Sequence, residues 1–185
     1  FCLKKKKKKK IKNKKKKEIT TTKVGYVYSL TEEMDVRTVT KKCEGVVIKS
    51  RTRGTGTGTL TVSMHMLWSL YVKVYGMIFT DKLAEGVYGY GKDSIHPEFT
   101  WVAKVLDEDG IEKYLAYPNC VINSGTSKKI ENGSDEVAEI EMTIAVSPDD
   151  QGFGKYECMA SELASGSEIA TKWLTSFNFE LIKKA

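Results

Sequence analysis

The chain has 185 residues, of which 41% are apolar and 29% are charged, a balance that suits one globular domain with a core of its own. No run of 18 or more apolar residues occurs, which excludes a typical membrane-spanning helix, and the lysine-rich start lacks the apolar stretch of a signal peptide. The formal net charge of +6 is uneven: residues 1–17 hold twelve lysines and no acid, whereas residues 18–185 hold 18 basic and 24 acidic residues.

The basic character therefore belongs to one low-complexity tract on an otherwise acidic chain. Such a block of like charges predicts a self-repelling arm, and a nucleic-acid-binding function would depend on this tract alone. The four cysteines are widely spaced and form no C-x-x-C pair: Cys2, Cys43, Cys120 and Cys158. That spacing argues against a zinc site and favours free thiols, with disulfides as the alternative.

Two strands are predicted early in the chain, over residues 23–30 and 45–53, because β-branched and aromatic residues alternate with polar ones. The polar residues 31–44 between them suit a loop or a segment that contacts a partner. In residues 54–64, glycines and threonines alternate. A phosphate-binding loop would need a Gly-Lys-Ser/Thr sequence and a following helix, and neither is present. The pattern predicts a strand whose glycines let another backbone approach closely.

A helix is predicted over residues 65–79, where apolar residues recur at helical spacing and form one stripe. Gly76 weakens that helix by about 1 kcal/mol relative to alanine, and a buried strand is the alternative. The glycine- and tyrosine-rich residues 83–96 predict a flexible connection that ends at Pro97.

The centre of the chain predicts a four-stranded antiparallel meander. Asp109-Gly110 and Asn132-Gly133 are hairpin turn signals between runs that alternate apolar and polar residues. The predicted strands span residues 98–107, 111–123, 126–131 and 135–146. Beyond them we expect a loop over 147–154, a short helix over 156–164, one or two more helical turns over 168–176, and a last strand or arm over 177–185.

No pattern in the sequence indicates a catalytic, metal or cofactor site, and we expect the protein not to be an enzyme. Glu139 and Glu141 share a strand face, which would allow a glycosidase-like acid/base pair, but no aromatic or histidine-rich cleft is predicted around them. His65 and His96 have no neighbouring acid or nucleophile in the pattern. A solvated acidic face is the better interpretation of the glutamates.

From Gly54 onward, the sequence resembles the tail tube (major tail) proteins of long-tailed bacteriophages and of related phage-like particles of Gram-positive bacteria. The resemblance covers about two-thirds of the chain and lies in its overall texture, since none of the matching stretches is a catalytic signature. These are GTGTLTVSMHM (56–66), YGYGKDSIHPEF (88–99), VAKVLDEDG (102–110), AYPNCVINSG (116–125), KIENGSDEVAEIEMTIAV (129–146) and PDDQGFGKYECMASEL (148–163), together with Lys172-Trp173. Residues 1–44 match nothing in the family.

The resemblance implies a mainly β fold: an antiparallel β-sandwich or barrel-like domain with one flanking α-helix and extended terminal arms. It divides the chain into an N-terminal arm and first strand over 1–44 and a tail-tube domain over 45–185. It further implies homohexameric rings that stack into a tube in the virion, assembled in the cytoplasm of the bacterial host. The implied partners are copies of the chain, other tail proteins at the tube ends (sheath or terminator, tape measure) and genomic DNA in transit, with no cofactor and no membrane.

An acidic body suits the wall of such a channel, because many lysines facing the lumen would bind phosphates and slow the DNA. The candidate lumen-facing residues are Glu139, Glu141, Glu98, Thr100 and Lys104. Two alternatives stay open. One is a capsid or baseplate decoration module with a β-sandwich fold. The other is a hydrolase that uses Glu139 and Glu141 or the two histidines.

Overall fold

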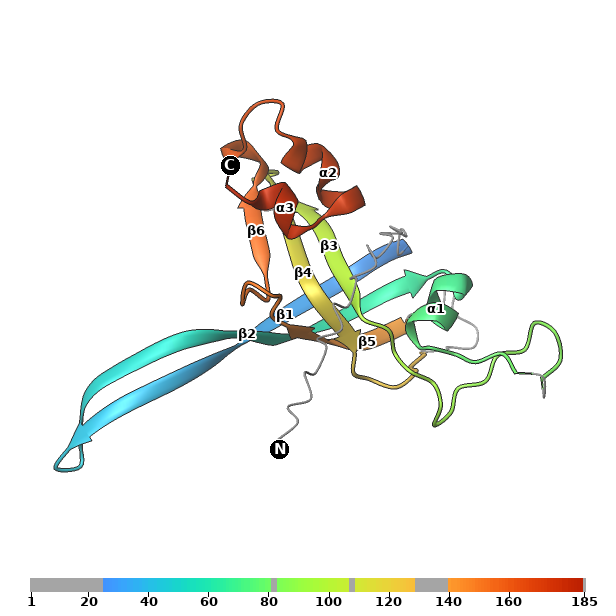
Figure 1. Ribbon diagram of the computed structural model, residues 1–185, viewed down its shortest axis with the longest axis horizontal. Coiled ribbons are helices and arrows are strands. Elements are labelled where there is room, and N and C mark those ends of the chain that lie inside the picture. Colours follow the sequence, from blue (N-terminus) through green and yellow to red (C-terminus); the bar gives the residue numbers. More distant parts are fainter. Residues whose placement is uncertain (1–24, 81–82, 107–108, 129–139, 185) are drawn as a thin grey trace, which may run out of the picture.

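The computed structural model describes residues 25–80, 83–106, 109–128 and 140–184 (Figure 1). In chain order its elements are β1 (Gly25–Cys43), β2 (Val46–Met66), α1 (Trp68–Val74), β3 (Phe99–Leu106), β4 (Glu112–Ile122), β5 (Ile140–Ser147), β6 (Tyr156–Met159), the 3-10 helix η1 (Ala160–Glu162), α2 (Glu168–Ser176) and α3 (Phe179–Ile182). The predicted fold class is confirmed, because the molecule is mainly antiparallel β with a few flanking helices.

The strands form one antiparallel sheet in the order β1-β2-β5-β4-β3, and β6 joins it by pairing with β4. Strand β4 is the corner of this sheet. Along one side it pairs with β3, while on the other side its first half pairs with β6 and its second half with β5. A register shift between Phe99 and Trp101 accompanies the change. In β-sandwiches, a strand that pairs with two different sets of neighbours in this way forms the corner between the two sheets.

The predicted four-stranded meander is confirmed only in part, because β4 pairs directly with β5 and the predicted strand over 126–131 does not lie between them. Strands β3, β4 and β5 match three of its four members, and Gly110 has the positive φ of 73° that the first turn signal predicts. Residues 126–128 lie in no strand. The remainder of the predicted strand 126–131, the Asn132-Gly133 turn and the start of strand 135–146 lie outside the described residues.

The main core lies on one face of the sheet, where alternate residues of β2 and β5 are buried. These side chains include Leu60, Val62, Met64, Ile140, Met142, Ile144 and Val146, and they are covered by Tyr71 of α1 and by Tyr75, which directly follows α1. Burying each such aliphatic side chain contributes roughly 1.5–3 kcal/mol. This face of the body is therefore closed within a single chain.

A second, smaller core lies on the opposite face of β3, β4 and β6, under the C-terminal helices. Trp173 of α2 is its centre: the indole is 2% exposed and its Nε1 donates a hydrogen bond to the Leu115 carbonyl at 3.0 Å. Phe177 packs on the indole with ring centroids 4.8 Å apart. Strand β4 is buried on both sides because Leu115 and Tyr117 face the main core, while Tyr114 and Ala116 face the second.

The outer parts of β1 and β2 form a long hairpin that projects from the body, and we call residues 36–54 the arm (Figure 1). Two corrections follow. The first strand is not short, and residues 31–44 are not a loop, because both continue as one strand of 19 residues that pairs with β2 to the tip. The turn at the tip is Glu44-Gly45, with positive φ angles of 51° and 81°.

The predicted helix over 65–79 is too long. Strand β2 continues to Met66, and α1 has only seven residues. The helix ends because Gly76 takes a φ of +56° and lies against the backbone of Ile95, whose carbonyl oxygen would be 2.1 Å from an added Cβ. The predicted connection over 83–96 is confirmed as mostly irregular, with one isolated bridge between Ile78 and Gly89.

The threonine-glycine segment is the predicted strand, and two of its glycines do allow a close backbone approach. A Cβ on Gly58 would lie 2.6 Å from the Glu33 carbonyl oxygen. Gly56 lies against the loop before β6, and a Cβ on Gly154 in that loop would lie 1.8 Å from the Gly56 carbonyl oxygen. Gly54 has open space around it.

Two C-terminal predictions are wrong and one is confirmed. Residues 156–164 are not a helix, because Tyr156–Met159 pairs with the free side of β4 before a single 3-10 turn. Within the predicted strand or arm over 177–185, the described residues 177–184 form neither: Asn178 caps the short helix α3 by accepting a hydrogen bond from the Leu181 N–H. Helix α2 spans the predicted 168–176.

Candidate assembly surfaces

The two histidines have structural contacts and lie on different parts of the molecule. The His96 Nδ1 lies 2.6 Å from the Ile122 carbonyl oxygen, and its Nε2 lies 3.1 Å from the Tyr90 hydroxyl. His96 therefore fastens the connection before β3 to β4. His65, near the end of β2, packs edge-on against Tyr28 with ring centroids 4.9 Å apart.

Among the described residues, no group of three or more His, Cys, Asp or Glu side chains lies close enough to hold a metal ion. Within the same residues, no helix is long and apolar enough to cross a membrane. Cys120 is buried, and burial raises the pKa of its thiol to about 12. Cys43 is exposed at the tip of the arm and Cys158 is half-buried.

Among the described residues, no element covers one face of β1, β2 and β5, and we call it the polar face. It is the side opposite the main core, because successive side chains of a strand point to opposite faces. Its members are short hydroxyl side chains with two glutamates and one alanine: Ser29, Thr31, Glu33, Thr59, Thr61, Ser63, Glu141, Thr143 and Ala145. The set contains neither lysine nor arginine, so it offers no cation to a phosphate.

The predicted lumen-facing residues fall on two parts of this side of the sheet. Glu141 is exposed on the polar face, opposite Ser63. Thr100 and Lys104 lie on β3, near the C-terminal helices, where the Thr100 hydroxyl donates to the Pro118 carbonyl at 2.8 Å. Lys104 Nζ donates to Glu112 Oε1 at 2.5 Å, so this cation is neutralised. The ammonium is largely exposed, and the hydrogen bond to Glu112 raises its pKa.

Of the other two predicted lumen residues, one is described. Glu98 is exposed just before β3. Glu139 lies outside the described residues, so its pairing with Glu141 stays a prediction.

A polar cluster fixes the base of the arm to the body. Glu32 of β1 accepts hydrogen bonds from the Tyr117 hydroxyl at 2.9 Å and from Lys155 Nζ at 2.7 Å. Lys155 also pairs with Glu157 at 2.8 Å. Burial lowers the pKa of the Lys155 ammonium, but the hydrogen bonds to Glu157 and Glu32 outweigh it and leave the pKa above its ordinary value. These partners join β1 to β4 and β6, so the arm leaves a rigid base.

The loop before β6 is held by Asp149. Its carboxylate accepts hydrogen bonds from the Tyr156 hydroxyl at 2.6 Å and from the N–H groups of Gln151 and Phe153. Burial raises the pKa of Asp149, but these hydrogen bonds outweigh it and leave the pKa below its usual value. The bonds from the Gln151 and Phe153 N–H groups hold the loop in a tight turn. This loop packs against Gly56 of β2.

An aromatic surface surrounds α1 and the connection that follows it. Trp68 stacks on Tyr71 with ring centroids 5.7 Å apart, and Lys128 Nζ lies 4.5 Å from the Tyr71 ring centroid. Trp68 is 53% exposed and Ile95 is 80% exposed, and further exposed apolar side chains belong to the same region: Leu67, Phe79, Val87, Tyr88 and Tyr90. Exposed apolar patches of this kind mark protein interfaces.

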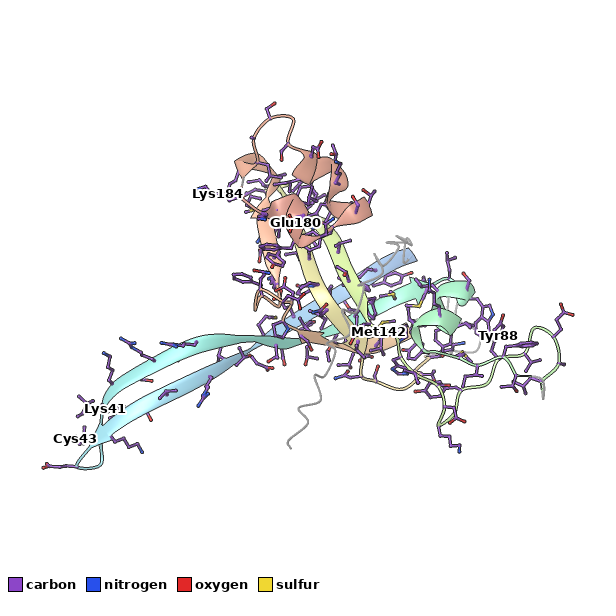
Figure 2. The ribbon with its side chains drawn as sticks, in the orientation of Figure 1. Lys41, Cys43, Tyr88, Met142, Glu180 and Lys184 are labelled. Carbon is purple, nitrogen blue, oxygen red and sulfur yellow. The ribbon has the colours of Figure 1, made fainter. Side chains whose placement is uncertain are left out.

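The arm carries a cationic face, defined by Arg37, Lys41, Lys49, Arg51 and Arg53 around Val39. Sequence reasoning missed it because residues 31–44 show no apolar alternation. The signal that was available is charge periodicity: lysine and arginine at 49, 51 and 53 occupy every second position of a predicted strand. Figure 2 shows Lys41 and Cys43 at the far end of the arm, remote from Met142 in the main core.

The chain was compared with known proteins and solved structures. The chain is similar to the cryo-EM structure of the anti-feeding prophage cap (AFP tube terminating cap), with 10% sequence identity and a TM-score of 0.46 over 75% of this chain and 86% of that chain. No family model matches the sequence, and no curated protein matches it. A likeness at this level assigns neither a family nor an activity.

Proposed function

We propose that the chain is a non-catalytic structural protein of a phage-like tail, in which homohexameric rings stack into a tube that conducts the genome. The observation that carries the proposal is the uncovered polar face on an open sheet. It combines hydroxyl side chains, two glutamates and no cation. A surface of this composition stays hydrated and does not hold a phosphate backbone.

The free edges of the sheet support assembly into a closed ring. Strand β1 has 19 residues and is paired on one side only within the described part of the chain, and β3 forms the other end of the strand order. Long unpaired edges expose rows of backbone donors and acceptors that invite pairing with another chain. Joining these edges around a ring satisfies them, as closure does in a barrel.

The aromatic surface supports a second contact between copies or with another tail protein. Trp68 and Ile95 are large apolar side chains that are mostly exposed to solvent. Trp68 is stacked on Tyr71, so its ring loses little conformational freedom when a partner covers it. In the proposed tail, the tube ends contact a sheath or terminator and a tape measure protein. Genomic DNA is a partner only in transit, and the tube belongs to the virion.

Electron microscopy of the purified protein tests the proposal. We expect hollow tubes or stacked rings with six-fold symmetry, accompanied by large sedimenting species in solution. Monomers or trimers that bind a capsid or baseplate would instead favour a decoration module. Glu141→Gln removes one charge from the polar face and leaves the core unchanged, so we expect it to assemble like the parent protein.

A further inference from the structure

The arm concentrates positive charge on a chain that is otherwise acidic. Residues 36–54 hold six basic residues and one acidic residue. Five of the six form the cationic face, where Arg37 lies directly opposite Arg53 and Lys41 directly opposite Lys49. Like charges at such cross-strand positions repel each other and weaken the pairing of the strands.

Nothing in the described part of the chain offsets this repulsion. None of the five cations makes an ion pair with a described residue, and every residue of the arm is exposed. A two-stranded hairpin is only marginally stable alone in water. The arm is therefore a ribbon whose positive charge no described residue of its own chain balances.

The side chains among the cations indicate a protein surface as that partner. Val39 sits between Arg37 and Lys41 on the cationic face and is 57% exposed. Elsewhere on the arm, Val36 and Ile48 are exposed, as are Val46 and Val47 near the tip. A phosphate chain alone would leave these aliphatic groups in water, whereas a protein surface covers apolar and charged groups together.

The acidic partner with matching spacing is present on the chain itself. Outside the arm, residues 18–35 and 55–185 hold 12 basic and 23 acidic residues. Glu33 and Asp35 lie at the base of the arm on the same face of β1 as Arg37, because the extra residues of the register shift there belong to β2. Successive residues on one strand face are about 7 Å apart, so Glu33 and Asp35 repeat the spacing of Arg51 and Arg53.

We propose that the arm of one copy docks its cationic face on Glu33 and Asp35 of a second copy. The arm points away from its own body, so it cannot make this contact within one chain (Figure 1). The contact joins two different patches of the same protein, which makes it heterologous and able to generate rings or helical stacks. It deepens the proposed function, and it covers the β1 side of the polar face while leaving Glu141 on β5 open.

A charge-swap series on the full chain tests this contact. We expect R51E/R53E and E33R/D35R each to raise the protein concentration at half-assembly by roughly tenfold or more, as the loss of at least two ion pairs implies. The combined variant restores the pairing with reversed sign and should return to within a few-fold of the parent protein. Raising the salt to about 1 M should weaken assembly of the parent and of the combined variant alike.

A matched pair of milder variants separates the cationic face from net charge. R51Q/R53Q and S50E/T52E both lower the net charge by two at neighbouring positions of β2, on opposite faces of the arm. We expect only R51Q/R53Q to impair assembly. The contact is overturned if both variants assemble equally, if the combined swap is no better than its two components, or if R51Q/R53Q loses affinity for duplex DNA and keeps its self-association.

The outcomes also distinguish this contact from the proposed tube. Tubes that form equally well in every arm variant would retain the structural function and eliminate the docking. Swap-dependent, salt-sensitive oligomers without rings or tubes would retain the docking and eliminate the tube. Every substituted position is exposed, so we expect each variant to fold. Circular dichroism of each variant checks that the fold is intact.

Discussion

Strand β2 runs through both regions of the molecule, the arm and the body, with β1 as its partner throughout. From Val46 to Thr55 every residue is exposed, whereas from Gly58 to Met64 alternate residues are buried. In the body, β5 pairs along the second side of β2, and the main core covers one face. The same antiparallel pairing of β1 with β2 therefore belongs to a packed core at one end and to a fully exposed hairpin at the other.

The two regions differ in whether charged side chains find partners of opposite charge within the same chain. The body pairs several of its cations with acids: Lys104 with Glu112, Lys113 with Glu157 and Lys172 with Glu168. The arm leaves its cations opposite one another. We therefore attribute stability to the body and association to the arm, and the following experiments test that division.

The largest contrast is expected in thiol reactivity. Cys43 at the arm tip is exposed, while Cys120 in the body is buried with its pKa raised to about 12. Because the thiolate is the nucleophile, Cys120 should react with iodoacetamide at pH 8 at least about a thousandfold more slowly than Cys43. Peptide mapping by mass spectrometry measures both sites, and the rates should converge in urea. Comparable rates for the two cysteines in the folded protein would show that Cys120 is accessible to solvent, which would contradict its burial in the core.

The next contrast compares two apolar residues of β2. Leu60→Ala removes a fully buried side chain from the main core and should lower the free energy of unfolding by about 2–5 kcal/mol. Ile48→Ala removes a side chain that is mostly in water and should change it by less than about 0.5 kcal/mol. Urea denaturation of dilute, unassembled protein measures both. Equal losses would mean that the arm is packed within the chain.

Glycine positions give a smaller contrast. Gly154→Ala forces a methyl group against the Gly56 carbonyl, so the loop before β6 must shift, at a cost of roughly 1–3 kcal/mol. Gly54→Ala is the matched control on the arm, because no atom lies near its Cβ position and its φ is not positive. It should be neutral or slightly stabilising. Thermal unfolding of the two variants decides whether the glycines differ as described.

The smallest effect is a pH dependence in the loop at Asp149. Its folded-state pKa is lowered, so its carboxylate contributes stability that is present above the unfolded pKa near 4 and is lost as the pH falls through the folded pKa. Tyr156→Phe removes the hydroxyl donor at 2.6 Å. The variant should lose about 1 kcal/mol less than the parent between pH 5 and pH 2, after solvent screening. Parallel pH profiles would remove Asp149 as the cause.

The sequence predicted the elements whose burial is periodic. Ile140, Met142, Ile144 and Val146 alternate with polar residues, and the structure buries them on one face. The predicted segment YECMASELA failed because helical spacing over a short stretch is also compatible with an edge strand, and here the free side of β4 decides. Helix α3 depends on the Asn178 cap, which a four-residue pattern does not reveal.

The assembly surfaces were predictable only in part. Glu141 was identified as an exposed acid on a strand, since alternation fixes its face. The arm was not, because residues 31–44 contain polar and charged side chains on both faces and their strand state comes from pairing with β2. Thr100 and Lys104 lie near the C-terminal helices and not beside Glu141, since the corner at β4 separates them.

A cryo-electron microscopy reconstruction of the assembled protein tests the central claim most directly. The account predicts a hollow tube of six-membered rings in which Glu141 faces the channel and the cationic face of each arm lies on Glu33 and Asp35 of another copy. A map in which the arms extend freely into solvent, or in which Glu141 is on the outer wall or buried between subunits, would contradict it.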